Sequence, residues 1–193
     1  MQVLRAAERV ATPWKNGGGV TREVAAWPPG AGFEDFHWRV SMAEVRADGP
    51  FSTFPGVDRI LAVLEGRLAL EIDGRQIELA VSGPPAAFPG DVPTTGRLLA
   101  GPVVDLNVMV RRGAVRAHLK PLRIDLALTL DPGAGTRLLV ARAPLHATGA
   151  AAVDLLPDDA LLLAADDPQM TLHAAAPATA FLATFTWISA RGR

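Results

Sequence analysis

Apolar and polar residues alternate along two stretches in the first half of the chain, residues 36–43 and residues 103–111. A period of two is typical of a β-strand that buries one face. The apolar faces carry Trp, Val, Met and Leu side chains. The opposite faces carry His37, Arg39 and Ser41 in the first stretch and Asp105, Asn107 and Met109 in the second. Because alternate residues of a small barrel point inward, we expect these two sets to line an interior pocket.

Short apolar runs separated by glycine, proline and aspartate fill much of the remaining chain. Residues 60–64, 68–72 and 76–81 are predicted strands, Asp73-Gly74 is a predicted tight hairpin turn, and Phe88-Pro-Gly-Asp91 is a further predicted turn. The second half continues with predicted strands at residues 123–130, 137–142, 145–147, 152–156, 160–164, 170–173 and 180–188. Short strands at such close spacing predict an all-β sandwich or barrel with few short helices.

The two halves of the chain share a faint repeat. Residues 138–142 align with residues 61–65 at a constant offset, and each segment is followed by a strand, a glycine turn and another strand. This predicts a degenerate internal duplication, joined near residues 112–121. We therefore expect two domains, residues 1–113 and residues 114–193. The second half is rich in alanine and has few polar clusters, so we expect it to be mainly structural.

The segment from Thr12 to Glu23 combines three consecutive glycines with polar side chains. Glycine permits positive φ and a close approach of a ligand or strand, and we expect positive φ at Gly18. The adjacent Lys15 and Asn16 stand out because the chain contains only two Lys and two Asn, against seventeen Arg. An ammonium and a guanidinium are not interchangeable, so these residues are binding candidates. A structural turn with a solvated lysine is an equally supported alternative.

Composition and charge exclude several classes of function. The chain has 193 residues, a formal net charge of −1 and no cysteine. Near neutrality of charge gives no reason to bind nucleic acid or an anionic membrane, and the absence of cysteine excludes disulfide and thiolate chemistry. Neither a leader peptide nor an apolar segment of bilayer length is evident. We expect a cytoplasmic protein with no nucleic-acid or membrane partner.

The sequence contains no motif typical of a metal, phosphate or nucleophile site. The four histidines are scattered without metal-ligand spacing, and the glycine segment is neither a dinucleotide fingerprint nor a phosphate loop. A triad could combine Ser41 or Ser52 with His37 and either Asp58 or Asp105, but no nucleophile elbow supports it.

Lys15, Arg39 and Arg59, together with Asn107, would form a cationic, amide-lined site suited to a small carboxylate. The candidate ligand-binding residues are Lys15, Asn16, Gly17, Gly18, Thr21, Arg39, Ser41, Phe54, Asp58, Arg59, Asp105, Asn107 and Met109.

Five ordered blocks, at residues 13–23, 36–41, 49–59, 88–91 and 101–113, resemble the successive signatures of the HutD/Ves family of cupins. The resemblance is strong over residues 3–113 and weaker beyond. It implies a duplicated cupin fold, or bicupin, of two β-barrels or jelly rolls. It also implies a role in sensing or regulating histidine utilisation by binding an intermediate such as formylglutamate.

The comparison with metal-binding cupins implies that this chain lacks their ligands. Those proteins place two histidines and a glutamate in the segment that is here residues 49–66, which contains no histidine. Arg59 lies about where the glutamate is expected, and Pro93 occupies the position of the last histidine. The resemblance thus predicts no bound metal, and we expect no other cofactor.

Three functions are consistent with these features. The first is a non-catalytic protein that binds a small acidic metabolite. The second is a metal-independent isomerase or hydrolase, with Asp58 or Asp105 as general base and Arg39 or Lys15 stabilising an oxyanion. The third is a regulator that acts through protein contacts alone. We favour the first, and a homodimer is left open.

Overall fold

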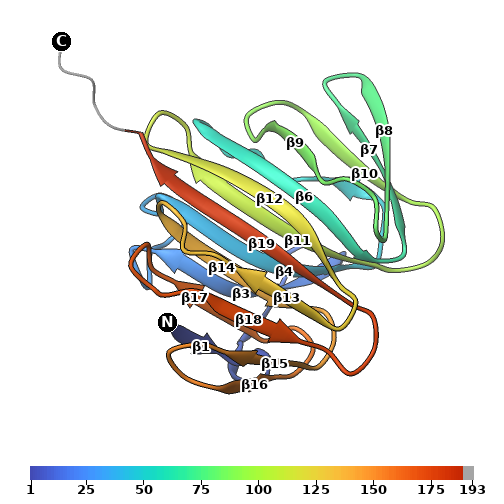
Figure 1. The fold of residues 1–193 in the computed structure, drawn as a ribbon. Coiled ribbons are helices and arrows are strands. Elements are labelled where there is room, and N and C mark those ends of the chain that lie inside the picture. The colour runs from blue at the N-terminus through green and yellow to red at the C-terminus, as the bar shows by residue number, and fades with distance from the viewer. Residues whose placement is uncertain (189–193) are drawn as a thin grey trace, which may run out of the picture. The chain divides into compact units, whose positions relative to one another are not determined.

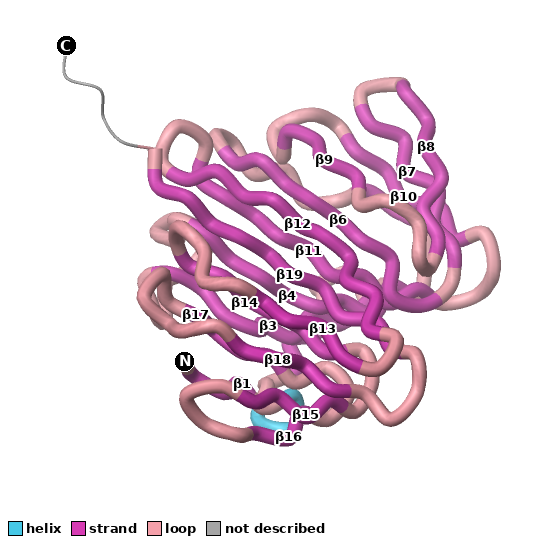
Figure 2. The backbone as a smooth tube through the Cα atoms, viewed as in Figure 1, coloured by secondary structure: helices cyan, strands magenta, loops and turns pink. Residues whose placement is uncertain are grey.

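The computed structural model describes residues 1–188 and consists almost entirely of strands. The helical content of the described residues is one 3-10 turn, η1 (Ala6–Glu8), which is the cyan segment near the N-terminus in Figure 2. The prediction of an all-β chain with few short helices is confirmed. No helix in residues 1–188 is long and apolar enough to span a membrane.

The chain forms two compact units. The first unit contains residues 10–116 with Ile188, and the second contains residues 1–9 with residues 117–187. The sequence placed residues 1–9 with the first unit instead. They belong to the second because β1 (Gln2–Leu4) pairs with β17 (Ala160–Leu163) through three residues at the edge of a sheet. The pairing of short β1 with a distant strand leaves no local signal in the sequence.

The first unit is built from two antiparallel sheets. The six-stranded sheet has the order β2 (Ala11–Pro13), β3 (Gly19–Trp27), β4 (Trp38–Val45), β11 (Val103–Arg111), β6 (Val57–Glu65) and β9 (Ala86–Pro89). The four-stranded sheet has the order β5 (Gly49–Pro50), β10 (Thr94–Leu98), β7 (Arg67–Ile72) and β8 (Arg75–Ala80). Figure 1 shows β3, β4, β11 and β6 side by side.

Apolar side chains from both sheets form the core of the first unit. Leu61 and Val63 from β6 and Leu68 and Leu70 from β7 belong to one buried cluster. The alternation along each strand explains the cluster, because every second residue of a strand points to the same face. The two sheets therefore enclose a shared apolar interior, as in a jelly roll.

The turn between β7 and β8 is the predicted tight hairpin. Asp73 and Gly74 have φ of 47° and 76°. Positive φ at both central residues is the feature of a type I′ turn, which Asp-Gly favours. The predicted turn at Phe88-Pro-Gly-Asp91 is wrong at its start, because Phe88 and Pro89 belong to β9.

The second unit repeats the arrangement of two antiparallel sheets. One sheet has the order β1, β17, β14 (Thr136–Ala141), β19 (Ala178–Trp187) and β12 (Val115–Ile124). The other has the order β13 (Ala127–Leu130), β18 (Met170–His173), β15 (Leu145–Thr148) and β16 (Val153–Leu155). Their buried apolar residues again form one cluster, which includes Leu139, Leu161 and Leu172. The predicted duplication of the fold is confirmed.

The segment predicted to join the halves is a strand. β12 occupies most of residues 112–121 and buries Val115, Leu119 and Leu122. This strand was not predicted from the sequence because polar and charged residues alternate with its apolar ones. The predicted strand at residues 123–130 is in fact two strands, because the chain leaves β12 after Ile124 and β13 begins at Ala127.

Candidate functional site

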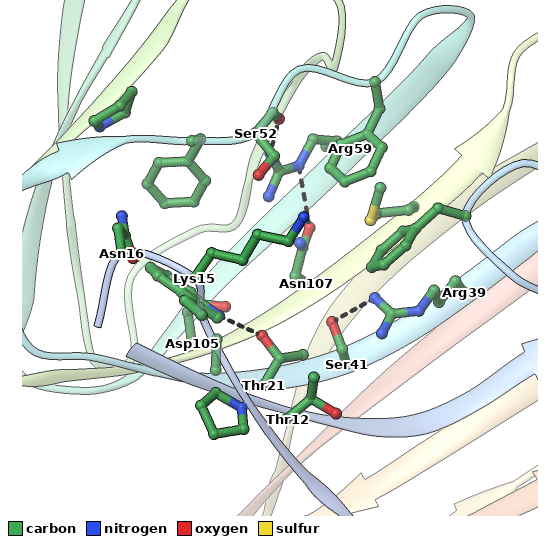
Figure 3. A pocket seen from close by; sticks show the side chains of 18 residues that line it. Thr12, Lys15, Asn16, Thr21, Arg39, Ser41, Ser52, Arg59, Asp105 and Asn107 are labelled. Carbon is green, nitrogen blue, oxygen red and sulfur yellow. Dashed lines mark hydrogen bonds between the residues drawn. The ribbon is translucent and has the colours of Figure 1, made fainter. Parts of the chain in front are cut away.

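One pocket lies over the face of the six-stranded sheet in the first unit, with a cavity volume of about 710 Å³. The strands β3, β4, β6 and β11 contribute its base, and β2, β5 and loops contribute its remaining walls (Figure 3). The pocket is lined by Thr12, Pro13, Trp14, Lys15, Asn16, Thr21, Phe33, Arg39, Ser41, Ala43, Pro50, Phe51, Ser52, Phe54, Arg59, Asp105, Asn107 and Met109.

Strand pairing arranges the polar residues of the base in rows. Met109 of β11 pairs with Arg39 of β4 on one side and with Arg59 of β6 on the other. The two arginines are thus two strands apart, which corresponds to about 10 Å between their Cα atoms. The next row pairs Asn107 with Ser41. The register therefore brings two guanidinium groups and one amide to the same base.

Arg59 is buried in an aromatic setting, with 4% of its surface exposed. Its guanidinium carbon lies 5.0, 5.8 and 5.3 Å from the ring centroids of Phe51, Phe54 and Phe88, respectively. A cation over aromatic faces is attracted by the ring quadrupoles, more strongly where water is excluded. The three rings therefore hold the guanidinium in place beside the pocket.

The polar contacts of Arg59 are long. Its Nε donates to Asn107 Oδ1 and its Nη1 donates to the carbonyl oxygen of Ser52, both at 3.4 Å. Burial lowers the pKa of Arg59 to about 10, although the nearby charge of Asp105 acts in the opposite direction. Arg59 is therefore charged at neutral pH, and its long hydrogen bonds leave it free to bind an anion more closely.

Asp105 lies in the base of the same pocket with 2% of its surface exposed. Burial raises the pKa of its carboxyl to about 7, and the charge of Arg59 only partly offsets that effect. Within residues 1–188, its carboxylate accepts no hydrogen bond. A buried carboxyl without a partner is costly to ionise, so Asp105 titrates near neutral pH.

Arg39 is held by a carboxylate at one edge of its guanidinium. Its Nε donates to Glu23 Oε2 at 2.7 Å, and its Nη1 donates to Ser41 Oγ at 3.4 Å. Its guanidinium carbon also lies 4.8 Å from the ring centroid of Phe33. The ion pair orients Arg39, and the guanidinium still lines the pocket.

The loop before β3 is a tight turn with a fixed aromatic residue. Trp14 Nε1 donates to Thr21 Oγ1 at 2.7 Å, and Asn16 Oδ1 accepts from the backbone N–H of Gly18 at 3.0 Å. Positive φ occurs at Gly17, at 70°, so the expectation of positive φ at Gly18 is wrong. The reason is that the Asn16 side chain closes the turn one residue earlier.

Gly19 is needed for close packing. A Cβ at this position would lie 2.5 Å from the carbonyl oxygen of Glu44 and 3.0 Å from the indole of Trp14. Both groups approach the bare Cα because no side chain is present. The glycine segment therefore positions Trp14 at the pocket wall.

Lys15 adds a third cation to the pocket. Its side chain is exposed, and no ion pair with it is present in residues 1–188. Figure 3 shows the side chains of Lys15, Arg39 and Arg59 directed into the same space. With Asp105 as the single carboxyl among the lining residues, the pocket is cationic.

The structure brings ten of the thirteen candidate residues to the pocket, namely Lys15, Asn16, Thr21, Arg39, Ser41, Phe54, Arg59, Asp105, Asn107 and Met109. Gly17 and Gly18 lie in the adjacent turn. Asp58 is not in the pocket, because it points to the opposite face of β6 from Arg59, where it pairs with Arg112 at 2.7 Å. His37 is likewise not among the lining residues, so a triad through His37 has no support.

Several lining residues were not predicted, and four of them, Trp14, Phe33, Phe51 and Ser52, are in loops. Phe33 and Phe51 contribute aromatic walls, and Ser52 contributes its backbone oxygen to Arg59. Phe33 stacks on Phe54 with ring centroids 5.4 Å apart. The only sequence signal for these residues was that bulky aromatic residues occur beside turn-forming glycine and proline.

The residues of this pocket do not fit the metal centre of a cupin. Arg59, at the position expected for a glutamate ligand, is a cation, and Lys15 and Arg39 add like charge. Among residues 1–188, no three His, Asp or Glu side chains are grouped so as to hold a metal ion. Cations beside a single carboxyl would repel a divalent metal ion.

Two sheets per unit, with a pocket over one sheet, define the chain as a cupin-type protein. The fold is similar to that of a cupin 2 conserved barrel domain protein from Leptotrichia buccalis, with a TM-score of 0.62 at 9% identity over 96% of this chain and 98% of that chain. The chain belongs to the HutD family, whose model matches residues 6–182.

Relatives at higher identity agree with this assignment. The chain is similar to a solved structure of HutD from Pseudomonas fluorescens SBW25, which was determined in a formate condition. The two are 30% identical, with a TM-score of 0.83 over 97% of this chain and 99% of that chain. It is 37% identical over 121 residues to an uncharacterized 21.2 kDa protein in the hutC 3′ region of Pseudomonas putida. That match spans 62% of this chain and 63% of the relative's length, so less than two thirds of that relative is covered. The chain is also 38% identical over 109 residues to protein Ves of Citrobacter koseri, which covers 55% of this chain and 56% of Ves.

Proposed function

We propose that the protein binds a small acidic metabolite of the formylglutamate type in this pocket and modulates histidine utilisation without catalysing a reaction. The observation that carries the proposal is that Lys15, Arg39 and Arg59 converge on one pocket, which has a single carboxyl among its lining residues. Arg59 is the buried member of the three, and a buried cation whose hydrogen bonds are long is costly unless an anion completes its site. A carboxylate ligand would supply that anion.

The spacing of the arginines favours a ligand with two carboxylates. Arg39 and Arg59 lie on either side of Met109, so each guanidinium could grip a different carboxylate through paired, charge-assisted hydrogen bonds. Asn107 accepts from Arg59 through Oδ1, which leaves its amide nitrogen to donate to a carbonyl oxygen. A formylated acidic amino acid has two carboxylates and one such carbonyl group.

The context of histidine utilisation comes from the family. The chain belongs to the HutD family, and one relative lies in the hutC 3′ region. A binding protein for an intermediate could report the level of that intermediate to the cell. The family context and the cationic pocket support this regulatory role.

Calorimetric titration with formylglutamate, glutamate and urocanate tests the proposal. We expect Arg39→Lys to weaken binding of the preferred acid by about 1.5–3 kcal/mol, because a lysine cannot form the two parallel hydrogen bonds of a guanidinium. Arg112→Lys is the matched control, since Arg112 binds Asp58 and Asp91 outside the pocket. Equal affinities in wild type and Arg39→Lys, or no binding of any of the three acids, would reject the proposal.

A metal-independent isomerase or hydrolase is the second candidate, and one observation favours it. The carboxyl of Asp105 has a pKa of about 7 because it is buried, which suits a general base or acid at neutral pH. Arg39 or Lys15 could then stabilise an oxyanion. If formylglutamate incubated with the protein is converted, and Asp105→Asn abolishes the conversion, the enzyme replaces the binding protein.

A further inference from the structure

Asp105 is surrounded by groups that cannot satisfy an ionised carboxylate. On the base, its strand neighbours are Ala43 of β4 and Val63 of β6. The charged groups that face the pocket from other elements are Arg39 on β4, Arg59 on β6 and Lys15 in the loop before β3, together with Glu23, which pairs with Arg39. Arg59 acts on Asp105 through charge alone, since its hydrogen bonds go to Asn107 and Ser52.

Resting on the proposed function, we infer that Asp105 takes up one proton when an acidic ligand enters the pocket and then donates a hydrogen bond to a ligand oxygen. Asp105 would thereby be a specificity-determining residue. It would favour ligands that present a carboxylate or carbonyl oxygen to β11 over ligands that present an N–H group there.

The physical reason is that two neighbouring carboxylates in a closed site cannot both remain ionised. Asp105 is buried, and a ligand would exclude the water that still reaches the pocket. The ligand would also add negative charge and engage Arg59, whose charge now acts on Asp105. Each change raises the pKa of the Asp105 carboxyl further above its value of about 7. The carboxyl then becomes a further donor to the ligand, beside the two guanidinium groups and the amide of Asn107.

Proton uptake makes affinity depend on pH with a definite sign. The competent form of the pocket has a protonated Asp105, which is the major form below about pH 7. Above that value the protonated fraction falls about tenfold per pH unit, so the apparent affinity should fall by the same factor. If Asp105 instead stayed ionised and accepted an N–H from the ligand, affinity would rise with pH.

Calorimetry in buffers of different ionisation enthalpy measures the protons taken up. The probe is formylglutamate at about pH 8, because neither of its carboxylates nor its amide titrates near that pH. The slope of the observed enthalpy against the buffer ionisation enthalpy should give close to one proton per ligand for the wild type. For Asp105→Asn it should give none, with an affinity that is the same at about pH 6 and pH 8. Asp58→Asn is the matched control and should behave as the wild type, since Asp58 lies outside the pocket.

The outcomes separate this inference from the proposed function. Binding of formylglutamate without proton uptake, or with equal uptake in Asp105→Asn, overturns the inference and leaves the binding function intact. No binding by the wild type between about pH 6 and pH 8 overturns both. If Asp105→Asn does not fold, NMR titration of the aspartate carboxyl carbons in the wild type gives the answer. One signal with a midpoint near 7 should move to a higher midpoint when formylglutamate is added, and an unmoved midpoint refutes the inference.

Discussion

Replacing Asp105 by asparagine should stabilise the protein increasingly as pH rises from about 5 to about 7. The amide is nearly the same size as the protonated carboxyl, and it cannot ionise. Burial raises the pKa of Asp105 from 3.8 to about 7 in the folded protein. The folded state therefore binds this proton more tightly than the unfolded state does. The contribution of Asp105 to the free energy of unfolding is therefore least favourable at high pH, where the buried carboxyl of the folded protein must lose its proton.

The magnitude follows from the two pKa values. Between about pH 5 and pH 7 the carboxyl is ionised in the unfolded chain and protonated in the folded one, so stability falls by about 1.4 kcal/mol per pH unit. Over this interval the wild type loses about 2.5 kcal/mol relative to Asp105→Asn, because the folded carboxyl is already half ionised at about pH 7. Above the folded pKa both states are ionised, and the difference should level off. The attraction between Asp105 and Arg59 is already part of the folded pKa.

Urea denaturation of both proteins at a series of pH values measures this difference. Tryptophan fluorescence is a suitable signal for the first unit, because Trp14 and Trp38 are both in it. The free energy of unfolding of Asp105→Asn minus that of the wild type should rise by about 2.5 kcal/mol between about pH 5 and pH 7. A difference that does not change with pH would refute the reasoning, because it would mean that the carboxyl titrates as in the unfolded chain. Asp58→Asn, which removes a carboxylate from an exposed ion pair outside the pocket, is the matched control.

Two further predictions concern stability. Gly19→Ala should lower the free energy of unfolding by about 2–3 kcal/mol in urea titrations, because its Cβ would meet the Glu44 carbonyl oxygen at 2.5 Å. Gly17→Ala is the control and should cost about 1 kcal/mol, because Gly17 has a φ of 70° but a Cβ there would meet no other atom within 4 Å. Equal costs of the two substitutions would contradict the packing assigned to Gly19. Asp159→Ala should destabilise the second unit by about 3 kcal/mol, because the buried carboxylate accepts from the backbone N–H groups of Ala6 and Leu156 and from Arg5. Burial raises the pKa of Asp159, but the hydrogen bonds outweigh it and lower the pKa overall, so the contribution of Asp159 is present above about pH 4 and lost in acid. The deficit of Asp159→Ala relative to the wild type should therefore shrink in acid, and a deficit of the same size in acid and at neutral pH would contradict this.

Strand faces could be predicted from the sequence, but strand pairing could not. Alternation along β4 and β11 correctly placed Arg39 with Ser41 and Asp105 with Asn107, because the period of a strand is fixed by backbone geometry. Which residue of one strand faces which residue of another depends on distant segments. The row that places Met109 between two arginines became visible only with the register.

The neighbouring residues Asp58 and Arg59 illustrate the same limit. The sequence made both of them candidates for ligand binding. In the structure both belong to β6, so their side chains point to opposite faces. Arg59 lies beside the pocket, and Asp58 pairs with Arg112. Loop residues such as Phe33 have no period at all, and their position in the wall could not be predicted.

The rare pair Lys15 and Asn16 was singled out because both residue types are scarce in this chain, and the structure gives the two residues different roles. Asn16 closes the turn through its bond to the Gly18 N–H, a local role that the chain requires with or without a ligand. Lys15 forms no ion pair within residues 1–188 and lies at the pocket where Arg39 and Arg59 also point. Folding alone gives no reason for a third cation beside two others, because like charges repel. The presence of a rare lysine at position 15 therefore supports ligand binding there. The presence of a rare asparagine at position 16 is explained by the turn.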